Sequence, residues 1–318
     1  MEYTTLGRTN LKVSVVGLGC GGHSRLGQSY GHTEAQSIDV VAAALDQGVN
    51  FIDTAAMYRT EEIVGKAIKG KWDQVILSTK IPVVQPDADP LGDELVPPTD
   101  FKQAVEKSLT RLGTDVIDIL HLHGVAPNQY ENCVRDLVPE LQKLQTEGKI
   151  RFIGLTERFI VDPQHTMLMS ALKDNSWDVI MAGFNMLNPS ARHRVFEVTR
   201  AKNIGTLIMF AVRRALSNKD ELCAVVQQLV AEGVVDASQV DQTDPFGFLV
   251  NSGDARSVVE AAYRFCRHER GADVILTGTG RIPHLTENIT SICGDNLGLE
   301  HLNRLSDIFG NVDSVSGN

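Results

Sequence analysis

The sequence predicts an α/β protein in which eight parallel strands close into a (β/α)8 TIM barrel, with an N-terminal β-hairpin and extra C-terminal helices. Three observations predict this fold. The chain has 318 residues, a length typical of one such barrel. Short apolar runs alternate with amphipathic stretches along the chain, which favours parallel strands joined by right-handed crossover helices. No linker rich in Gly, Ser or Pro divides the chain, so we expect one domain over residues 1–318.

The elements follow in a regular order. The hairpin is expected over 3–14, with Gly7–Asn10 as its turn. The barrel strands are expected at 15–19, 50–54, 75–80, 116–123, 150–155, 179–184, 206–210 and 274–276. The first helix begins near Thr33, where Thr33 and Gln36 form a capping box, and ends at Gln47. Further helices are expected at 60–69, 99–112, up to 147, 162–173, 189–202, 219–230 and 254–267, with two more closing the chain. The alternative arrangement of these elements is an open doubly wound sheet.

Two long connections stand out. Residues 81–98 follow the third strand and carry five prolines, and residues 237–253 precede the late helix at 254–267. Long loops that follow barrel strands lie at the catalytic face and commonly form lids. We therefore expect both segments to border a binding site.

The charge and cysteine content narrow the range of partners. The formal net charge is −10 and no stripe of Lys and Arg is visible, so we expect neither nucleic acid nor an anionic membrane surface as a partner. The five cysteines lie far apart, which is typical of reduced thiols in a cytoplasmic protein. The first residues are polar and lack a signal peptide, and no apolar run is long enough to span a bilayer.

Four polar residues follow the ends of three neighbouring strands. Asp53 ends the second strand, Tyr58 lies in the loop after it, Lys80 ends the third strand and His123 ends the fourth. Strand carboxyl ends share one face of a barrel, so we expect these side chains to meet there. Singly, each has an ordinary structural explanation, such as a turn cap, a solvated lysine or a core histidine. Their joint placement favours a catalytic site.

The chemistry of this group is general acid catalysis. A free phenol has a pKa near ~10, too high for efficient proton exchange at neutral pH. An adjacent ammonium lowers that pKa, a carboxylate keeps the ammonium charged, and a histidine can orient a substrate oxygen. Such a site suits a carbonyl group, but no side chain supplies a hydride. The residues therefore imply a nicotinamide cofactor.

Sequence motifs at these positions resemble those of the aldo-keto reductase family. The resemblance covers nearly the whole chain, in order, and is carried by GVNFIDTAAMY at 48–58, EEIVGKA at 61–67, LGTDVIDI at 112–119 running into His123, EGKIRFIG at 147–154, YTTLGRT at 3–9 and GLG at 17–19. It implies that Tyr58 donates the proton, that Lys80 and Asp53 tune it, and that His123 positions the carbonyl of an aldehyde, ketone or corresponding alcohol.

The same resemblance implies a set of cofactor contacts. In chain order the candidates are Gly19, Cys20, Gly21, Thr156, Glu157, Met181, Phe184, Phe210, Ala211, Arg213, Gly278, Thr279, Gly280, Arg281, His284, Glu287 and Asn288. Thr156 and Glu157 replace the Ser-Asn pair that usually holds the carboxamide, Met181 replaces a usual Gln, and Phe184 is the expected stacking aromatic. Arg281 is the candidate for the 2′-phosphate, which favours NADP(H) over NAD(H).

Other functions remain open from the residues alone. Because the carboxamide contacts are altered, the chain can be a regulatory subunit that binds the cofactor with little turnover. His121 and His123, with Asp53, also resemble the ligands of a metal-dependent barrel hydrolase, although Lys80 among the ligands argues against it. The pattern Gly17-x-Gly19-x-x-Gly22 is not a dinucleotide fingerprint, because no helix follows it directly. Acidic residues in 81–98 suggest a substrate that is not anionic.

Overall fold

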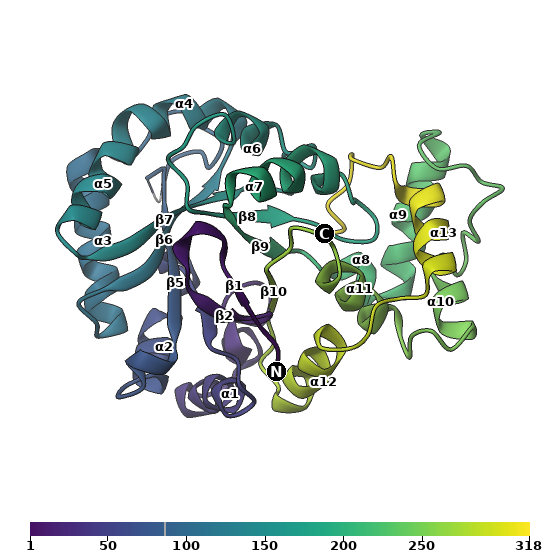
Figure 1. Cartoon of the computed structure of the whole chain (residues 1–318), viewed down its shortest axis with the longest axis horizontal. Helices are drawn as coiled ribbons and strands as arrows, with labels where there is room; N and C mark the ends of the chain where they lie inside the picture. Colours follow the sequence, from purple (N-terminus) through teal and green to yellow (C-terminus); the bar gives the residue numbers. More distant parts are fainter. Residues whose placement is uncertain (86) are drawn as a thin grey trace.

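Eight parallel strands form a closed barrel in the computed structural model, which describes residues 1–85 and 87–318 (Figure 1). The strand order around the barrel is β10-β3-β4-β5-β6-β7-β8-β9. The strands are β3 (Val16–Gly19), β4 (Phe51–Asp53), β5 (Ile76–Pro82), β6 (Ile117–Val125), β7 (Ile150–Glu157), β8 (Val179–Gly183), β9 (Gly205–Met209) and β10 (Val274–Thr277). The expected (β/α)8 TIM barrel is confirmed, and an open doubly wound sheet is excluded because β10 pairs with both β3 and β9.

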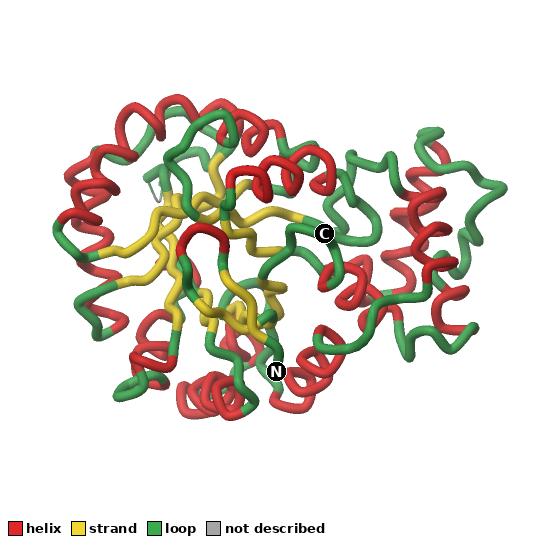
Figure 2. The backbone as a smooth tube through the Cα atoms, in the orientation of Figure 1, coloured by secondary structure: helices red, strands yellow, loops and turns green. Residues whose placement is uncertain are grey.

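Helices surround this barrel, as the tube view shows (Figure 2). They are α1 (Glu34–Asp46), α2 (Glu61–Ala67), α3 (Pro98–Leu112), α4 (Tyr130–Asn132), α5 (Val138–Thr146), α6 (Thr166–Ala171), α7 (Glu197–Lys202), α8 (Arg214–Ser217), α9 (Lys219–Ala231), α10 (Gly247–Asn251), α11 (Val258–Arg267), α12 (Ile282–Ile292) and α13 (Leu299–Phe309). The capping box of Thr33 and Gln36 forms as predicted at the start of α1. Single π-helical turns at Cys133–Leu137 and Arg192–Phe196 precede α5 and α7.

The N-terminal hairpin closes the end of the barrel opposite the strand carboxyl ends. β1 (Tyr3–Thr5) and β2 (Lys12–Ser14) pair antiparallel, as predicted. Leu6, Leu11 and Val13 of this hairpin are buried with strand residues that point inward, including Phe51 and Leu207. Burial of this apolar surface excludes water from the half of the barrel that contains the amino ends of the strands. The open end for chemistry is therefore the other one.

Several helix boundaries differ from the predicted ones. The helix expected at 162–173 is shorter, because the Asp162 carboxylate accepts hydrogen bonds from the backbone N–H groups of Thr166 and Met167 and starts α6 there. The helix expected at 254–267 begins after Ser257, whose hydroxyl accepts from the Glu260 N–H. In both cases a side chain outside the helix satisfies the free N–H groups of its first turn.

The segment 237–253 does not form the expected lid. It contains α10 and packs against α13, where the rings of Phe246 and Phe309 lie 5.3 Å apart. The Cys223 thiol of α9 donates to the Thr243 carbonyl in the same segment. In Figure 1, α9, α10 and α13 lie together at one end of the molecule, away from the barrel strands. The segment is a helical extension of the barrel instead of a cover for its mouth.

Among the described residues, no helix combines the length and the apolar character needed to cross a bilayer.

Candidate active site at the carboxyl ends of the barrel strands

The structure brings Asp53, Lys80, Tyr58 and His123 together at one end of the barrel. The Lys80 ammonium donates to the Asp53 carboxylate at 2.5 Å and to the Thr54 carbonyl at 2.8 Å. Asp53 also accepts from the Ser78 hydroxyl at 2.8 Å. Both members of the pair are buried, with 1% and 3% of Lys80 and Asp53 exposed. Each buried charge has lost its contact with water and is stabilised by its partner, so the two side chains are held in fixed positions.

Tyr58 stands over this ion pair at the end of a short 3-10 turn, Ala56–Tyr58. The Lys80 ammonium lies 5.0 Å from the centroid of the Tyr58 ring, and the Tyr58 hydroxyl lies 3.5 Å from Nε2 of His123. The ring packs on Gly21, where a Cβ atom would come within 2.4 Å of it. Arg25 holds the turn from outside by donating to the Tyr58 carbonyl at 2.8 Å. The phenol is therefore fixed in place, with its hydroxyl facing the imidazole.

The protonation of the site follows from burial and charge. Burial raises the pKa of the Tyr58 phenol, and the Lys80 ammonium opposes this effect without overcoming it. Lys80 therefore lowers the pKa of Tyr58 as expected, but burial has the larger effect and the pKa is raised overall. Burial disfavours the Lys80 ammonium, but the combined effects of Asp53, Tyr58 and Cys20 outweigh it, so the pKa of Lys80 is raised and the side chain stays charged. Burial, Lys80 and Arg158 together lower the pKa of His123 to about 3. At neutral pH the site holds an ammonium, a protonated phenol and a neutral imidazole.

A pocket of about 1230 Å³ extends from Asp53 and Tyr58 across the ends of β3, β9 and β10 to α11 and α12. Typical small-ligand pockets span ~300–1,000 Å³, so this one is large enough for an extended dinucleotide. Its glycines Gly19, Gly21, Gly278 and Gly280 let backbone approach a ligand closely, as phosphate groups require. The residues of the pocket thus fit a nicotinamide dinucleotide.

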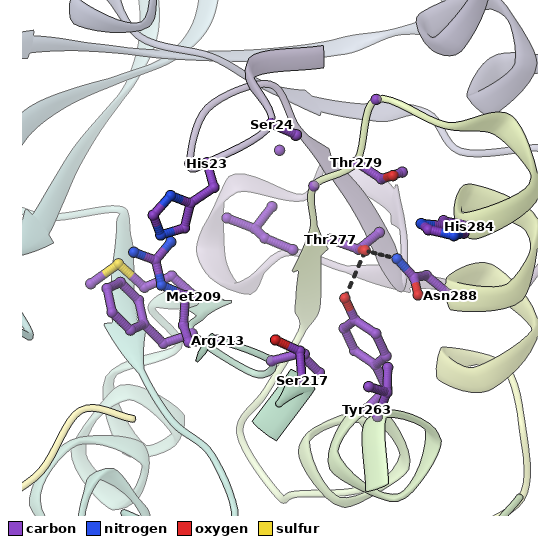
Figure 3. Close-up of a pocket in the computed structure, with 18 of the residues that line it drawn as sticks. His23, Ser24, Met209, Arg213, Ser217, Tyr263, Thr277, Thr279, His284 and Asn288 are labelled. Atoms are coloured by element: carbon purple, nitrogen blue, oxygen red, sulfur yellow. Dashed lines mark hydrogen bonds between the residues drawn. The ribbon is translucent and has the colours of Figure 1, made fainter. Parts of the chain in front are cut away.

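The end of the pocket beyond β10 carries most of the predicted phosphate and adenosine contacts (Figure 3). Thr279 and Arg281, just before α12, and His284, Glu287 and Asn288, within it, all line this end. The Asn288 amide donates to the Thr277 hydroxyl at 2.8 Å, and that hydroxyl lies 2.8 Å from the Tyr263 hydroxyl. These bonds fix α11, β10 and α12 against one another around the pocket.

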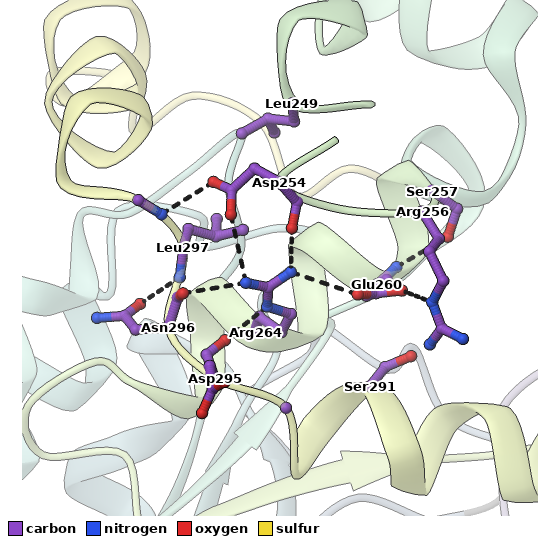
Figure 4. Close-up of polar contacts among 12 residues, drawn as sticks. Leu249, Asp254, Arg256, Ser257, Glu260, Arg264, Ser291, Asp295, Asn296 and Leu297 are labelled. Atoms are coloured by element: carbon purple, nitrogen blue, oxygen red, sulfur yellow. Dashed lines mark hydrogen bonds and ion pairs between the residues drawn. The ribbon is translucent and has the colours of Figure 1, made fainter. Parts of the chain in front are cut away.

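Arg264 holds α11 in place from behind the pocket (Figure 4). Its guanidinium donates to the backbone carbonyls of Asp295 at 2.5 Å and Asn296 at 3.0 Å, and also to that of Asp254. Glu260 lies between Arg264 at 3.3 Å and Arg256 at 2.5 Å. Since Arg256 and Glu260 line the pocket, this network sets the charge at its far end.

Phe210 and Arg213 border the pocket after β9. Phe210 has a φ of +65°, a left-handed conformation that non-glycine residues rarely adopt. The Arg213 guanidinium lies over the Phe210 ring, 4.4 Å from its centroid, and donates to the Asn318 side chain at 2.5 Å. Met181 also lines the pocket, whereas Ala211 is buried beside it. The pair of Phe210 and Arg213 offers an aromatic face and a positive charge to a ligand.

Other predicted cofactor contacts point elsewhere. The Thr156 hydroxyl accepts from the Gly124 N–H at 2.6 Å, and the Glu157 carboxylate accepts from the Gly183 N–H at 2.7 Å and lies 2.9 Å from Nδ1 of His165. Phe184 stacks on Phe265 in the core, with ring centroids 5.4 Å apart. Cys20 is fully buried. Their cofactor roles stay predictions, and of the two phenylalanines Phe184 and Phe210 it is Phe210 that lines the pocket.

Sequence reasoning missed several residues of the pocket. His23 and Ser24 follow β3, and Ser217, Arg256, Ser257 and Tyr263 belong to or adjoin α8 and α11. His23 and Ser24 could have been found, because they follow a strand end at the catalytic face. The others come from helices that no motif connects to the barrel mouth. Conversely, neither long loop, 81–98 or 237–253, contributes a described residue to the pocket lining, and Pro86 of the first loop lies outside the described residues.

The family model described as "Aldo/keto reductase family" matches residues 17–307, nearly the whole chain. The chain belongs to this family. It is 30% identical to the aldo-keto reductase YhdN of Bacillus subtilis (strain 168) over 99% of this chain and 95% of that protein. It is also 30% identical to the NADH-specific methylglyoxal reductase of Escherichia coli (strain K12), over 64% and 65% of the two chains. The holo form of aldo-keto reductase AKR11C1 from Bacillus halodurans has the same fold, with a TM-score of 0.70 at 23% identity over 96% and 95% of the chains.

Membership in the aldo-keto reductase family makes the chain an NAD(P)H-dependent carbonyl oxidoreductase. It does not favour the regulatory subunit or the metal-dependent hydrolase. The geometry also argues against the hydrolase. Asp53, which would be the third metal ligand, already accepts hydrogen bonds from Lys80 and Ser78.

Proposed function

We propose that the protein interconverts an aldehyde or ketone and the corresponding alcohol with NADP(H), and that Tyr58 is the general acid and base. The observation that carries this proposal is the position of the Tyr58 phenol. It lies between the buried Lys80–Asp53 pair and the neutral His123, at the end of a pocket that fits a dinucleotide. A substrate oxygen next to both the phenol and the imidazole would then have a proton source and an orienting group.

The residues divide the chemistry among them. A bound nicotinamide supplies or accepts the hydride at the carbonyl carbon. In reduction, Tyr58 gives its proton to the oxygen, and the nearby Lys80 ammonium stabilises the resulting phenolate. The neutral imidazole of His123 orients the carbonyl by a hydrogen bond without adding charge. Asp53 keeps the ammonium in position throughout.

We propose NADP(H) as the preferred cofactor. Arg256, Arg281 and His284 line the adenosine end of the pocket, where a 2′-phosphate would add negative charge. Glu260 and Glu287 line the same end, and Glu260 is paired with Arg256. This leaves Arg281 as the cation best suited to the phosphate.

We place this activity in the cytoplasm. All five cysteines are free thiols, three of them buried. A reducing compartment keeps such thiols in that state.

Replacement of Tyr58 by Phe tests the acid assignment. Tyr58→Phe removes the proton donor and keeps the ring that packs on Gly21, so we expect kcat to fall by about 10²–10⁴-fold. The dissociation constant of NADPH, measured by fluorescence titration, should change less than about threefold. Turnover close to that of the wild type would refute the role of Tyr58.

Replacement of Arg281 by Ala tests the cofactor preference. A lost charge-assisted contact to the 2′-phosphate should weaken NADPH binding about tenfold or more and leave NADH binding nearly unchanged. Titration of both nucleotides against the wild type and Arg281→Ala gives the comparison. Equal weakening of the two would exclude Arg281 as the phosphate contact.

A further inference from the structure

The side of the active site that receives the substrate follows from the lining of the pocket. The pocket is formed by residues at and after β3, β4, β8, β9 and β10, and by α11 and α12. Tyr58 stands at its edge, and His123, which faces the Tyr58 hydroxyl, belongs to β6. A carbonyl that contacts both Tyr58 and His123 therefore has the rest of its molecule toward the ends of β6 and β7.

Arg158 is a positively charged residue at this place. It follows directly on β7, and its Nε donates to the Gly124 carbonyl at 3.1 Å. A Cβ atom built on Gly124 would lie 3.7 Å from its guanidinium. Gly124 is the residue next to His123, and adjacent Cα atoms are only ~3.8 Å apart. The guanidinium thus lies against the backbone of the residue that follows His123, and its charge acts on the imidazole that positions the carbonyl.

The backbone at Gly124 is shaped to keep this position. The pairing of β6 with β7 shifts register between Leu122 and Val125, and Gly124 has a φ of +63°. Its N–H donates to the Thr156 hydroxyl at 2.6 Å while its carbonyl accepts from Arg158. A Cβ atom at position 124 would contact the guanidinium, and a residue other than glycine would be strained at this φ. The Thr156 hydroxyl, which is also the expected carboxamide contact, supports this turn.

The charge of Arg158 is not neutralised within the protein. Among the described residues, no carboxylate oxygen lies within 4.0 Å of its guanidinium, whereas Arg151 on the same strand is 2.5 Å from Asp118. The acid whose charge acts on it is Asp89, which is exposed and accepts from the Leu91 N–H. The Arg158 side chain is partly buried, and its charge contributes to the low pKa of His123. A partly buried cation beside a reacting carbonyl is suited to an anionic ligand.

We propose that Arg158 binds the carboxylate of the substrate, and that the preferred substrates are short oxo acids whose carboxylate lies close to the carbonyl. This inference rests on the proposed function. The carbonyl carbon gains the hydride and its oxygen gains the Tyr58 proton, while the carboxylate is unchanged and serves only for binding. The acidic residues of 81–98 suggested the opposite preference, but at the site itself the unpaired charge is positive.

The test compares an acid with its uncharged ester. Initial rates are measured with saturating NADPH for pyruvate and methyl pyruvate, in the wild type, Arg158→Gln and Arg158→Lys. The wild type should have a kcat/KM for pyruvate at least tenfold above that for the ester. Arg158→Gln should lower the acid-to-ester ratio about 10- to 100-fold, the loss expected for a charge-assisted bidentate contact. Arg158→Lys should keep part of the ratio.

The ratio separates binding from damage to the site. If Arg158→Gln acts only by disturbing His123, both rates fall and the acid-to-ester ratio stays that of the wild type. That outcome would overturn the proposal, as would a wild type that prefers the ester. Arg151→Gln is the matched control, because Arg151 lies at the opposite end of β7, and the acid-to-ester ratio should be that of the wild type.

A binding measurement covers the case in which neither compound is turned over. Calorimetric titration of the NADPH-bound protein with oxamate, which resembles pyruvate but is not reduced, should give a dissociation constant at least tenfold weaker in Arg158→Gln. Equal binding, or no binding to the wild type, would overturn the role of Arg158. Reduction of neutral aldehydes with no preference for acids would overturn this inference alone, whereas no turnover of any carbonyl would overturn the proposed function.

Discussion

At the scale of single residues, the active site works by confining charge to one ion pair. The Lys80 ammonium stays charged beside the Asp53 carboxylate, and the phenol and imidazole around the pair are neutral. A neutral His123 can hold a carbonyl oxygen without competing with Lys80 for the phenolate. The sequence indicated the four residues but not their net pKa directions, since burial depends on the whole barrel mouth.

The low pKa of His123 makes a prediction about stability. In the folded protein the pKa of His123 is about 3, against about 6.5 in an unfolded chain. Below pH 6.5 the unfolded state binds a proton that the folded state does not. His123 therefore favours folding above pH 6.5, and this contribution is lost as the pH falls from about 6.5 to about 3.

Urea unfolding of the wild type and His123→Asn at pH 7, 6 and 5 measures this effect. The slope of the unfolding free energy against pH should be smaller in the variant by about 1.4 kcal/mol per pH unit below pH 6. His121, whose pKa is lowered mainly by burial and Lys80 and to a smaller extent by His123, is present in both proteins, so most of its contribution cancels. The exposed His193→Asn serves as the control. Identical slopes in the wild type and His123→Asn would show that His123 titrates normally.

At the scale of elements, local signals predicted the barrel and long-range contacts decided the rest. The strands and the capping box of Thr33 and Gln36 are encoded within a few residues, so they were predicted correctly. The start of α6 depends on Asp162, four residues before the helix, and on the left-handed His165. Which aromatic ring lines the pocket, Phe184 or Phe210, depends on the packing of Phe184 against α11. No local pattern carries that information.

Glu157 is a second example, and it makes a prediction at this scale. Its buried carboxylate joins β7 to the Gly183 N–H at the end of β8 and to His165 before α6. His165 stacks on Phe159, and Phe159 contacts the edge of Phe210. A row of contacts thus runs from Glu157 to the pocket.

Glu157→Ala should destabilise the protein by about 3–5 kcal/mol in urea unfolding, because it leaves His165 and the Gly183 N–H without their buried partner. Glu157→Gln keeps the shape and one acceptor oxygen, so it should cost less. Glu197→Ala, which removes the exposed partner of His193, is the matched control and should change stability little. A Glu157→Ala variant as stable as this control would contradict the structural role and leave Glu157 available as a cofactor contact.

At the scale of the whole molecule, the last residues connect the helical extension back to the barrel mouth. In Figure 1 the chain leaves α13 and its end lies beside β8 and β9. The Asn188 amide donates to the Val315 carbonyl at 2.8 Å. The Asn185 amide donates to the carbonyls of Ser316 and Phe210, at 3.1 and 3.2 Å. Segment 311–318 therefore touches the same residues that border the pocket.

This arrangement predicts that segment 311–318 supports cofactor binding. Arg213 donates to Asn318, and the backbone of Phe210 shares the Asn185 amide with Ser316. A chain that stops at Gly310 loses these contacts, so Phe210 and Arg213 should move more freely and NADPH should bind about tenfold more weakly. Asn318→Ala, which removes only the Arg213 contact, should have a smaller effect. Fluorescence titration with NADPH and thermal unfolding of all three proteins separate the possibilities. A lower Tm with unchanged NADPH affinity would mean that the segment stabilises the fold but does not position the pocket.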